Sequence, residues 1–388
     1  MVALRIITSQ PVQYHVPLFR ELARQEVDLE VVFYHPGGTL ASNFDVELGR
    51  VVQWDVDLLS GYRHRFIISK QASYSRLEQI KTLPHILYQA FRQPRTPVLL
   101  VGWFMLSIWL VWAIRILLGL PVAVISETTL QSYQQTPKPR WRTRLLSWLL
   151  SHSLCYAIGT NNKAFLEQMG VPASRIVMTP YSIDNAYFAA RQEALLADRA
   201  GLCREYGLDP DLPTFLFCGK LIPLKRTQDM IKAFQMSHLL DKAQFIFVGD
   251  GHLRGELEHF IDSAKINSAH LLGFFNYSQL PIAYALGEVL LLISEETWGL
   301  VVNEACACKR PVIVSRTVGC APDLVGPENG WVLEAPSVEA LAQALQEAYN
   351  QRGRWSEMGS AGYTRVAGHT FANMAAGVIA GLTMMKSL

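Results

Sequence analysis

Apolar runs rich in β-branched residues alternate with helical patterns along the whole chain, and this alternation limits the possible folds most strongly. The runs include ALRIITS, PVLLVG and PVAVIS in the first half, and TFLFCGK, QFIFVGD, HLLGF, EVLLLIS, PVIVS and GWVLE in the second. Each run is apolar throughout, as in strands that are buried on both faces of a parallel sheet. Because strands and helices alternate, the chain is predicted to belong to the α/β class.

The alternation pauses once, after residue 181, and this pause divides the chain into two blocks. A charged helical stretch, AARQEALLADRAGLCREYG, is followed by the Pro-rich hinge DPDLP. A length of 388 residues also suits two domains. We predict two Rossmann-like domains, at residues 1–190 and 191–365, and a C-terminal helix at 366–388, for which packing on the first domain is one option. Ligands then belong at the carboxyl ends of the strands, where loops of both domains can face one cleft.

Composition argues against several classes of function. The formal net charge is +2, which does not suit a general nucleic-acid-binding protein. Residues 1–190 carry 18 Lys or Arg and 12 Asp or Glu, whereas residues 191–388 carry 17 and 21. The basic first half indicates an anionic partner, such as phosphate or a lipid surface, with generic surface charge as the alternative. The six cysteines lack the spacing of metal ligands, so we expect buried thiols and no metal site.

Two segments bear on the location of the protein. The N-terminus, MVALRIITSQ, has no basic region before an apolar stretch, so no signal peptide is predicted and we expect a cytoplasmic protein. Residues 98–114 contain no charge and are close to the lower length limit of a membrane span. The break at Gly102 and Trp103 favours a buried strand followed by a core helix over a transmembrane helix.

The loop at residues 218–226 is suited to binding a diphosphate. It places Lys220, Lys225 and Arg226 between an apolar strand and the helical pattern TQDMIKAF. Lysines beside a helix N-terminus attract a diphosphate, and Gly219 lets the backbone approach it closely. A solvated basic turn is the alternative.

The next two loops indicate a nucleotide-binding site less strongly. Gly249 lies in VGDGH, which is typical of a tight turn between a strand and a helix. Phe274 lies in the apolar loop LLGFF, which could cover a nucleobase. Phe274 and Phe275 more often belong to a core than to a base platform.

The segment SEETWGLVVNEA carries two carboxylates, Glu296 and Glu304, on either side of a glycine turn. A helix is predicted to begin at Leu300, and Glu304 lies about one turn inside it, where it can accept hydrogen bonds from two ribose hydroxyls. Glu296 ends the preceding strand and is expected near the sugar that the diphosphate carries.

The start of this helix completes the predicted donor site. The backbone N–H groups of Gly299, Leu300 and Val301 can hold a diphosphate. Lys220 and Lys225 are expected to neutralise the charge of the diphosphate and of the two carboxylates.

These motifs, in this order, resemble those of the retaining glycosyltransferases of family 4. SEETWGLVVNEACACKRPVIVS resembles the E-x7-E signature, FCGKLIPLKR the phosphate loop, VGDGHLRGELE the VGDGP turn, LLGF the base-binding loop and PYSIDNAYF the segment entering the domain linker. The resemblance is close over residues 176–335, and in the first half it is limited to the layout and SQPVQYHVPLFREL. It implies the GT-B fold, in which two Rossmann-like domains face each other across a deep cleft.

The resemblance implies transfer of a sugar from a nucleoside diphosphate sugar to an acceptor hydroxyl with retention of configuration. Glu296 would orient the donor sugar and Lys225 would stabilise the leaving diphosphate in a front-face reaction, without a metal ion or another cofactor. A nucleotide-sugar epimerase on the same fold and a non-catalytic nucleotide-sugar-binding protein are the alternatives. The sequence does not define the donor sugar, the base, the linkage or the oligomeric state.

The acceptor side is less defined, because the first half departs from the family pattern. Glu127 follows PVAVIS, where many members of the family have a histidine. We predict that Glu127 acts on the acceptor hydroxyl as a catalytic residue. Gln13, Tyr14 and His15 follow the first strand and are predicted to contact the acceptor, although Tyr14 and His15 suit a packing role equally well.

The phosphate loop also differs from the family pattern at two positions. Lys220 stands where the family usually has Arg, which replaces a bidentate contact by a point charge. Arg226 stands where the family usually has Gly.

The segment RWRTRLLSWLL, at residues 140–150, is a second signal for a partner. On a helix, Trp141, Leu145 and Trp148 share a face, with Arg140 and Arg144 beside it. This pattern suits an anionic membrane surface, and an ordinary core-facing helix explains it equally well. The acceptor classes considered are therefore a glycolipid, a polysaccharide precursor and a small molecule, with peripheral attachment to the inner face of the cell membrane as an option.

Overall fold

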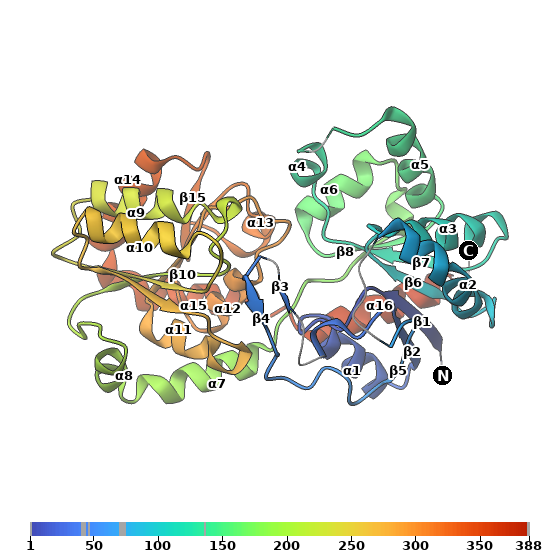
Figure 1. Ribbon diagram of the computed structural model, residues 1–388, viewed down its shortest axis with the longest axis horizontal. Coiled ribbons are helices and arrows are strands. Elements are labelled where there is room, and N and C mark those ends of the chain that lie inside the picture. The colour runs from blue at the N-terminus through green and yellow to red at the C-terminus, as the bar shows by residue number, and fades with distance from the viewer. Residues whose placement is uncertain (1, 40–43, 46, 70–74, 136, 386–388) are drawn as a thin grey trace. The chain divides into compact units, whose positions relative to one another are not determined.

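The structure is a computed structural model that describes residues 2–39, 44–45, 47–69, 75–135 and 137–385 (Figure 1). The chain forms two compact units. The first consists of Met1–Asn43, Val51–Ser182 and Thr370–Leu388, and the second of Phe44–Arg50 and Ile183–His369.

The first unit contains a seven-stranded sheet in the order β5-β2-β1-β6-β7-β8-β9, in which every neighbouring pair is parallel. The central strands β1, β6, β7 and β8 are buried at all or all but one of their positions, as continuously apolar sequences predict, whereas the edge strands β5 and β9 are partly exposed. The strands are β1 (Ala3–Thr8), β2 (Asp28–Phe33), β5 (Arg63–Phe66), β6 (Val98–Val101), β7 (Val122–Ile125), β8 (Leu154–Ala157) and β9 (Ile176–Met178).

Helices cover both faces of this sheet. A hydrophobic cluster fills the space between the sheet and the helices α2, α3, α5 and α6, while α1 and α16 pack on each other and α16 also contacts β8 and β9. The helices are α1 (Val16–Arg24), α2 (Arg76–Phe91), α3 (Leu106–Leu117), α4 (Leu130–Gln134), α5 (Arg140–Ser151), α6 (Thr160–Gln168) and α16 (Phe371–Met385).

Residues 98–114 form a strand and a helix, as the break at Gly102 indicated. β6 ends at Val101, and α3 begins at Leu106 after a turn in which Gly102 has a φ of 69°. Among the described residues, no helix has both the length and the apolar character needed to cross a membrane.

The second unit contains a six-stranded parallel sheet in the order β12-β11-β10-β13-β14-β15. The strands are β10 (Thr214–Cys218), β11 (Gln244–Val248), β12 (Ala269–Gly273), β13 (Val289–Leu292), β14 (Val312–Ser315) and β15 (Gly330–Leu333). All six were predicted from the apolar runs of the second half.

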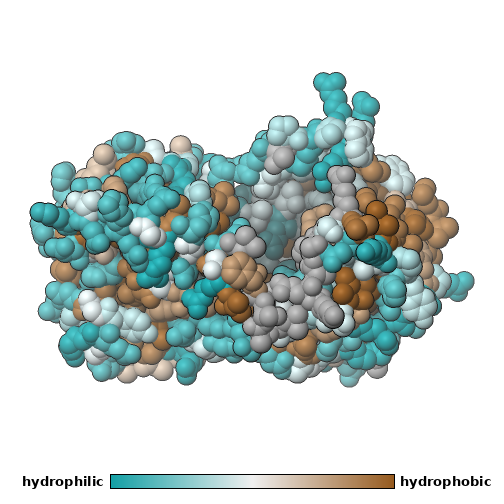
Figure 2. All heavy atoms as spheres, in the orientation of Figure 1, coloured by the Kyte–Doolittle hydropathy of each residue, from teal (hydrophilic) through white to brown (hydrophobic). Residues whose placement is uncertain are grey.

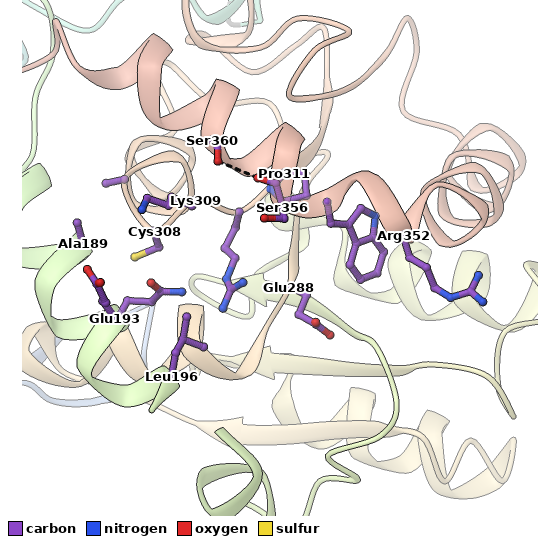
Figure 3. A pocket seen from close by; sticks show the side chains of 14 residues that line it. Ala189, Glu193, Leu196, Glu288, Cys308, Lys309, Pro311, Arg352, Ser356 and Ser360 are labelled. Atoms are coloured by element: carbon purple, nitrogen blue, oxygen red, sulfur yellow. Dashed lines mark hydrogen bonds between the residues drawn. The ribbon is translucent and has the colours of Figure 1, made fainter. Parts of the chain in front are cut away.

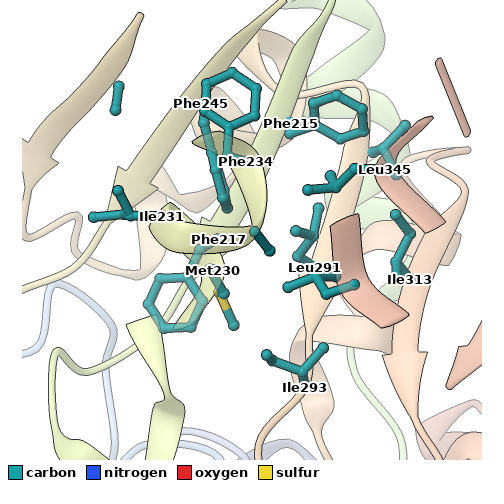
Figure 4. Packing of buried hydrophobic residues seen from close by; sticks show 14 of the residues in the cluster. Phe215, Phe217, Met230, Ile231, Phe234, Phe245, Leu291, Ile293, Ile313 and Leu345 are labelled. Carbon is teal, nitrogen blue, oxygen red and sulfur yellow. The ribbon is translucent and has the colours of Figure 1, made fainter. Parts of the chain in front are cut away.

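Helices cover both faces of the second sheet as well. Figure 1 shows α9, α10 and α14 over one face and α11, α12 and α15 over the other. Figure 4 shows part of the core, where Phe215, Phe234 and Phe245 pack with aliphatic side chains of β13 and β14. The helices are α7 (Asn185–Leu196), α8 (Arg199–Glu205), α9 (Thr227–Met236), α10 (Arg254–Ser263), α11 (Leu280–Leu286), α12 (Leu300–Ala307), α13 (Ala321–Leu324), α14 (Val338–Asn350) and α15 (Trp355–Val366).

The division into units differs in detail from the predicted boundaries. The chain leaves the first unit after Ser182 rather than after residue 190, because α7 packs on α11 and α12 of the second unit. The charged stretch after residue 188 is two helices, since α7 ends at Leu196 and Asp198 caps α8. The C-terminal residues from Thr370 onward belong to the first unit, and of the predicted helix residues 386–388 lie outside the described part of the chain.

One short element was not predicted. Two strands, β3 (Phe44–Asp45) and β4 (Arg50–Val51), pair with each other. The segment Phe44–Arg50 belongs to the second unit, although the chain on either side of it belongs to the first.

All six cysteines are buried and none forms a disulfide, as expected from their apolar surroundings. Cys155 lies in the first unit, and the other five lie in the second unit.

Candidate functional site

The candidate site lies at the topological switch point of the second sheet. β10 has β11 on one side and β13 on the other. The helices that follow β10 and β13, α9 and α12, cover opposite faces of the sheet (Figure 1). In doubly wound sheets, ligands bind outside the carboxyl ends of the strands at such a point. The loops that meet here are residues 219–226 and 294–299.

Close backbone approach fixes the first of these loops against its neighbour. Gly219 has a φ of 156° and Gly249 a φ of 149°, values that side chains rarely permit. A Cβ atom on Gly249 would lie 1.8 Å from the carbonyl oxygen of Gly219. The two turns therefore pack backbone against backbone.

Lys225 and Glu296, from the two loops of the switch point, form an ion pair. Their side chains are only 19% and 17% exposed, so the pair is partly shielded from water. The hydroxyl of Ser294 also donates to Glu296 Oε1 over 2.7 Å. The structure thus brings together the two side chains to which the sequence assigned catalytic roles in this domain.

The residue after Lys225 has an unusual backbone. Arg226 has a φ of 55°, which lies in the left-handed region that favours glycine. Glycine, which the resembled family has at this position, adopts such a conformation without strain. Here the arginine donates through Nε to Asp229 over 2.8 Å, so its charge is paired within α9.

Lys220 is paired with two carboxylates from the unpredicted segment Phe44–Arg50. Its Nζ lies 3.0 Å from Asp45 Oδ2 and 2.6 Å from Glu47 Oε2. Burial acts to lower the pKa of Lys220, but the hydrogen bonds to Glu47 and Asp45 outweigh it and raise the pKa. Lys220 is therefore a firmly charged group at the carboxyl end of β10.

The second loop leads into the predicted helix. Gly299 has a φ of 102° and precedes α12, which begins at Leu300. A Cβ on Gly299 would lie 2.9 Å from the side chain of Leu292 and 3.0 Å from that of Val318. The first N–H groups of a helix have no partner within it, so those of Leu300 and Val301 are suited to an anion.

Glu304 lies on α12 and is only 1% exposed. The Tyr284 hydroxyl donates to its Oε2 over 2.5 Å. Burial raises the pKa of Glu304 to about 7, and the hydrogen bond from Tyr284 opposes this shift. Within the described residues its Oε1 makes no hydrogen bond, so this oxygen is left to accept from a ligand.

The aromatic residues of the next loop differ from each other. Phe275 is 8% exposed and belongs to the interior. Phe274 is half-buried, and the guanidinium of Arg50 lies 5.0 Å from its ring centroid. Of the two, Phe274 is the one that can contact a base.

The first unit brings together most of the residues predicted for the acceptor. Tyr181 donates to Glu127 Oε1 over 2.7 Å and lies 3.3 Å from His15 Nε2. Burial lowers the pKa of His15, against the effect of the Glu127 charge. The sequence did not assign a role to Tyr181, although it lies in the PYSIDNAYF motif.

Two atoms of this cluster have unused hydrogen-bonding capacity. Gln13 Oε1 and His15 Nδ1 are buried without a hydrogen-bond partner among the described residues. Buried polar atoms are normally paired, so each is a candidate contact for a ligand. Tyr14, next to them, is half-buried.

A small cavity of about 180 Å³ lies close to Glu127. Thr128, the next residue, lines it together with Trp103 and Trp109, and Lys138 and Arg142 supply positive charge. Within the described residues, no three His, Cys, Asp or Glu side chains come together in a way that could hold a metal ion.

Two doubly wound parallel sheets, with a switch-point site on the second, define the class of this protein. A sucrose-phosphate synthase from Thermosynechococcus elongatus has the same fold, with a TM-score of 0.75 and 17% identity over the whole of both chains. Anabaena HepE in complex with UDP and glucose also matches over the whole of both chains, with a TM-score of 0.72 and 15% identity. The fold is therefore that of the GT-B glycosyltransferases, which confirms the predicted fold class.

Residues 200–365 match the profile of the family described as glycosyl transferases group 1. The second unit is thus similar to this family, which is family 4 of the glycosyltransferases, as the resemblance predicted. The GDP-mannose-dependent monoacylated alpha-(1-6)-phosphatidylinositol monomannoside mannosyltransferase of Corynebacterium glutamicum is 28% identical over 178 residues, which are 44% of this chain and 46% of the relative. The chain thus spans about half the length of the curated relatives it matches.

Proposed function

We propose that the chain transfers a sugar from a nucleoside diphosphate sugar to an acceptor hydroxyl, with retention of configuration at the anomeric carbon. The observation that carries this proposal is the Lys225–Glu296 ion pair at the switch point of the second sheet. It combines a cation suited to a diphosphate with a carboxylate suited to sugar hydroxyls, next to the start of α12.

In the proposed reaction the donor diphosphate lies against Lys225 and the first N–H groups of α12. The bond between the anomeric carbon and the phosphate oxygen breaks, and negative charge develops on the leaving diphosphate. Fixed positive groups aimed at this charge are usually the largest contribution to catalysis. Lys225, Lys220 and the N-terminus of α12 would supply them without a metal ion.

The same proposal assigns the acceptor hydroxyl to the side from which the diphosphate leaves. Its oxygen bonds to the anomeric carbon, and its proton passes to a leaving phosphate oxygen. Glu296 would hold hydroxyls of the donor sugar, and Glu304 would hold the ribose. Glu127, with His15 and Tyr181, would position the acceptor.

The donor base is not defined by these residues. The Corynebacterium relative is named as GDP-mannose-dependent, whereas HepE was solved with UDP and glucose. Guanine and uracil nucleotides are therefore the first donors to compare. The relative's acceptor is named as a phosphatidylinositol monomannoside, which makes a glycolipid the first acceptor class to test here.

The test begins with titration of the full chain with UDP-, GDP- and ADP-sugars. The donor that binds is then incubated with glycolipid, polysaccharide and small-molecule acceptors, with and without EDTA. We expect release of the nucleoside diphosphate, an α-linked product from an α-linked donor, and turnover that persists in EDTA.

Each other result contradicts part of the proposal. An isomerised sugar nucleotide without transfer would indicate an epimerase. Binding without turnover on any acceptor class would indicate a nucleotide-sugar-binding protein. An inverted product in the NMR spectrum, or complete loss of activity on chelation, would overturn the mechanism.

A further inference from the structure

A cavity of about 470 Å³ lies in the second unit (Figure 3). It is at the opposite end of the strands from the candidate donor site. Glu288 and Pro311, which line it, directly precede β13 and β14. The cavity is thus at the amino ends of these strands, whereas the donor loops follow their carboxyl ends. A volume of this size is within the range of small-molecule sites, roughly 300–1,000 Å³.

Positive charge dominates the wall of this cavity. Lys309, Arg310 and Arg352 line it, and Figure 3 shows Lys309 and Arg352 on opposite sides. Of the two acidic residues in the wall, Glu288 is already bound to Arg199 over 3.2 Å. Glu193 is exposed and is the remaining negative charge.

Arg310 has unused hydrogen-bonding capacity. Its Nε donates to the carbonyl oxygen of Tyr284 over 2.7 Å. Its Nη2 is buried and has no partner among the described residues. An unpaired guanidinium nitrogen of this kind is costly unless a ligand or water satisfies it.

The start of α15 also faces the cavity. Trp355 and Ser356, the first residues of this 12-residue helix, line the wall, and no side chain caps the helix. The N–H of Trp355 already donates to the carbonyl oxygen of Arg352 in the preceding 3-10 turn, so the helix contributes mainly its dipole, which favours an anion such as phosphate. Gln192, Glu193 and Ser360 add groups that can hydrogen-bond hydroxyls.

We infer that this cavity binds a small phosphate ester that carries hydroxyl groups, and that this ligand changes the affinity of the donor site. The phosphate would lie between Lys309, Arg310 and the start of α15, and its hydroxyls near Gln192 and Glu193. The first part of the inference stands on the cavity alone, while the second rests on the proposed function.

Two hydrogen bonds connect the cavity to the donor site. Arg310 donates to the backbone of Tyr284, and the side chain of Tyr284 donates to Glu304. In addition, α12 connects the two sites, because it begins after Gly299 in the donor loop and ends at Ala307 in the cavity wall. A ligand that moves Arg310 therefore acts on the group proposed to hold the ribose, and linkage makes the effect reciprocal.

The experiment titrates the full chain with glycerol 3-phosphate by calorimetry, in the presence of a saturating nucleoside diphosphate that occupies the donor site. Glycerol and inorganic phosphate are the comparison probes. We expect glycerol 3-phosphate to bind with one site per chain, more tightly than inorganic phosphate, and glycerol not to bind. We also expect the affinity for the nucleoside diphosphate to change at least about fivefold when glycerol 3-phosphate is present.

Two lysines offer a matched pair of variants. Lys309 and Lys265 are both exposed, follow helices of the second unit and have φ values of 53° and 54°. Lys309→Gln should weaken binding of glycerol 3-phosphate about tenfold, and Lys265→Gln should leave it unchanged. Arg310→Lys, which keeps the charge but removes Nη2, should also weaken it.

Absence of binding, or equal effects of the two lysine variants, would overturn the site. Binding of glycerol 3-phosphate without any change in nucleotide affinity would overturn the connection through Tyr284. If nucleoside diphosphates fail to bind while glycerol 3-phosphate still binds, the proposed function fails and the cavity site stands.

Discussion

At the scale of single residues, the proposed donor site contains a lysine that forms an ion pair with a carboxylate. Lys225 pairs with Glu296, so a neighbouring side chain of the protein orients it. Lys225→Ala should weaken binding of a nucleoside diphosphate about tenfold to a hundredfold, since a charge-assisted contact contributes roughly 1.5–3 kcal/mol. Calorimetric titration measures this effect, with the exposed Lys242→Ala as the control. Equal affinities of the two variants would remove Lys225 from the site.

Glu304 makes the stability of the folded protein depend on pH in a specific way. Its folded pKa is about 7, against an ordinary value of 4.5, because burial disfavours the charged form. Between these pH values the folded state keeps a proton that the unfolded state loses, so stability falls as pH rises through 7. Glu304→Gln removes this penalty, which amounts to at most about 3 kcal/mol. The melting temperature of the variant relative to the wild type should therefore be higher at pH 8 than at pH 5, and parallel pH profiles would contradict this.

At the scale of elements, the segment Phe44–Arg50 binds Lys220, which we propose as a contact of the donor diphosphate. A diphosphate that binds Lys220 must displace Asp45 and Glu47. Because such partly exposed ion pairs each contribute less than about 1 kcal/mol, Asp45→Asn with Glu47→Gln should raise nucleoside diphosphate affinity roughly threefold to tenfold.

The control for this double variant removes two charges elsewhere in the second unit. Glu205→Gln with Glu339→Gln changes exposed carboxylates outside the donor loops and should leave the affinity unchanged. Unchanged or lower affinity in the Asp45 and Glu47 variant would mean that Lys220 does not contact the diphosphate.

The sequence predicted helices and strands better than it predicted which side chains contact one another. The apolar runs identified all six strands of the second sheet, and the glycine turn before Leu300 located the start of α12. The partners of Lys220 could not be predicted, because Asp45 and Glu47 lie more than 170 residues away in a segment without an apolar run.

Two further features of the site depend on folded geometry. Tyr284 reaches Glu304 only because α11 and α12 lie on the same face of the sheet (Figure 1). The left-handed backbone of Arg226 contradicts the preference of its residue type, so only comparison with the family pattern could indicate it. Local patterns define strands and turns, whereas side-chain partners depend on the packing of distant segments.

At the scale of the whole molecule, the first unit exposes apolar side chains next to positive charge. Trp141 on α5 is 66% exposed and Leu117 on α3 is 73% exposed, while the buried face of α5 consists of Leu146, Leu149 and Leu150. Of the predicted face, Trp141 and Leu145 are therefore exposed, whereas Trp148 is partly buried and packs against the core. Figure 2 shows hydrophobic side chains gathered over the part of this unit where α3 lies.

This surface leads to a prediction about membranes. The wild-type chain should float with vesicles that contain anionic lipid, and Arg140, Arg142 and Arg144→Glu should reduce flotation several-fold, because each basic residue near the surface contributes about 1 kcal/mol. Lys242, Lys265 and Arg354→Glu makes the same charge change in the second unit and is the control. Equal flotation of the two triple variants would contradict attachment through α5.

The buried cysteines make it possible to measure the opening of each unit separately. Burial raises the pKa of Cys155 and of Cys306 to about 12, and a protonated, enclosed thiol reacts slowly with alkylating reagents. A unit must open before its thiols are modified, and the first unit has one thiol while the second has five. The mass of the alkylated chain therefore reveals which unit has opened, since one adduct marks the first and five mark the second. The natural sequence thus carries a built-in label for measuring the stability of its two halves separately.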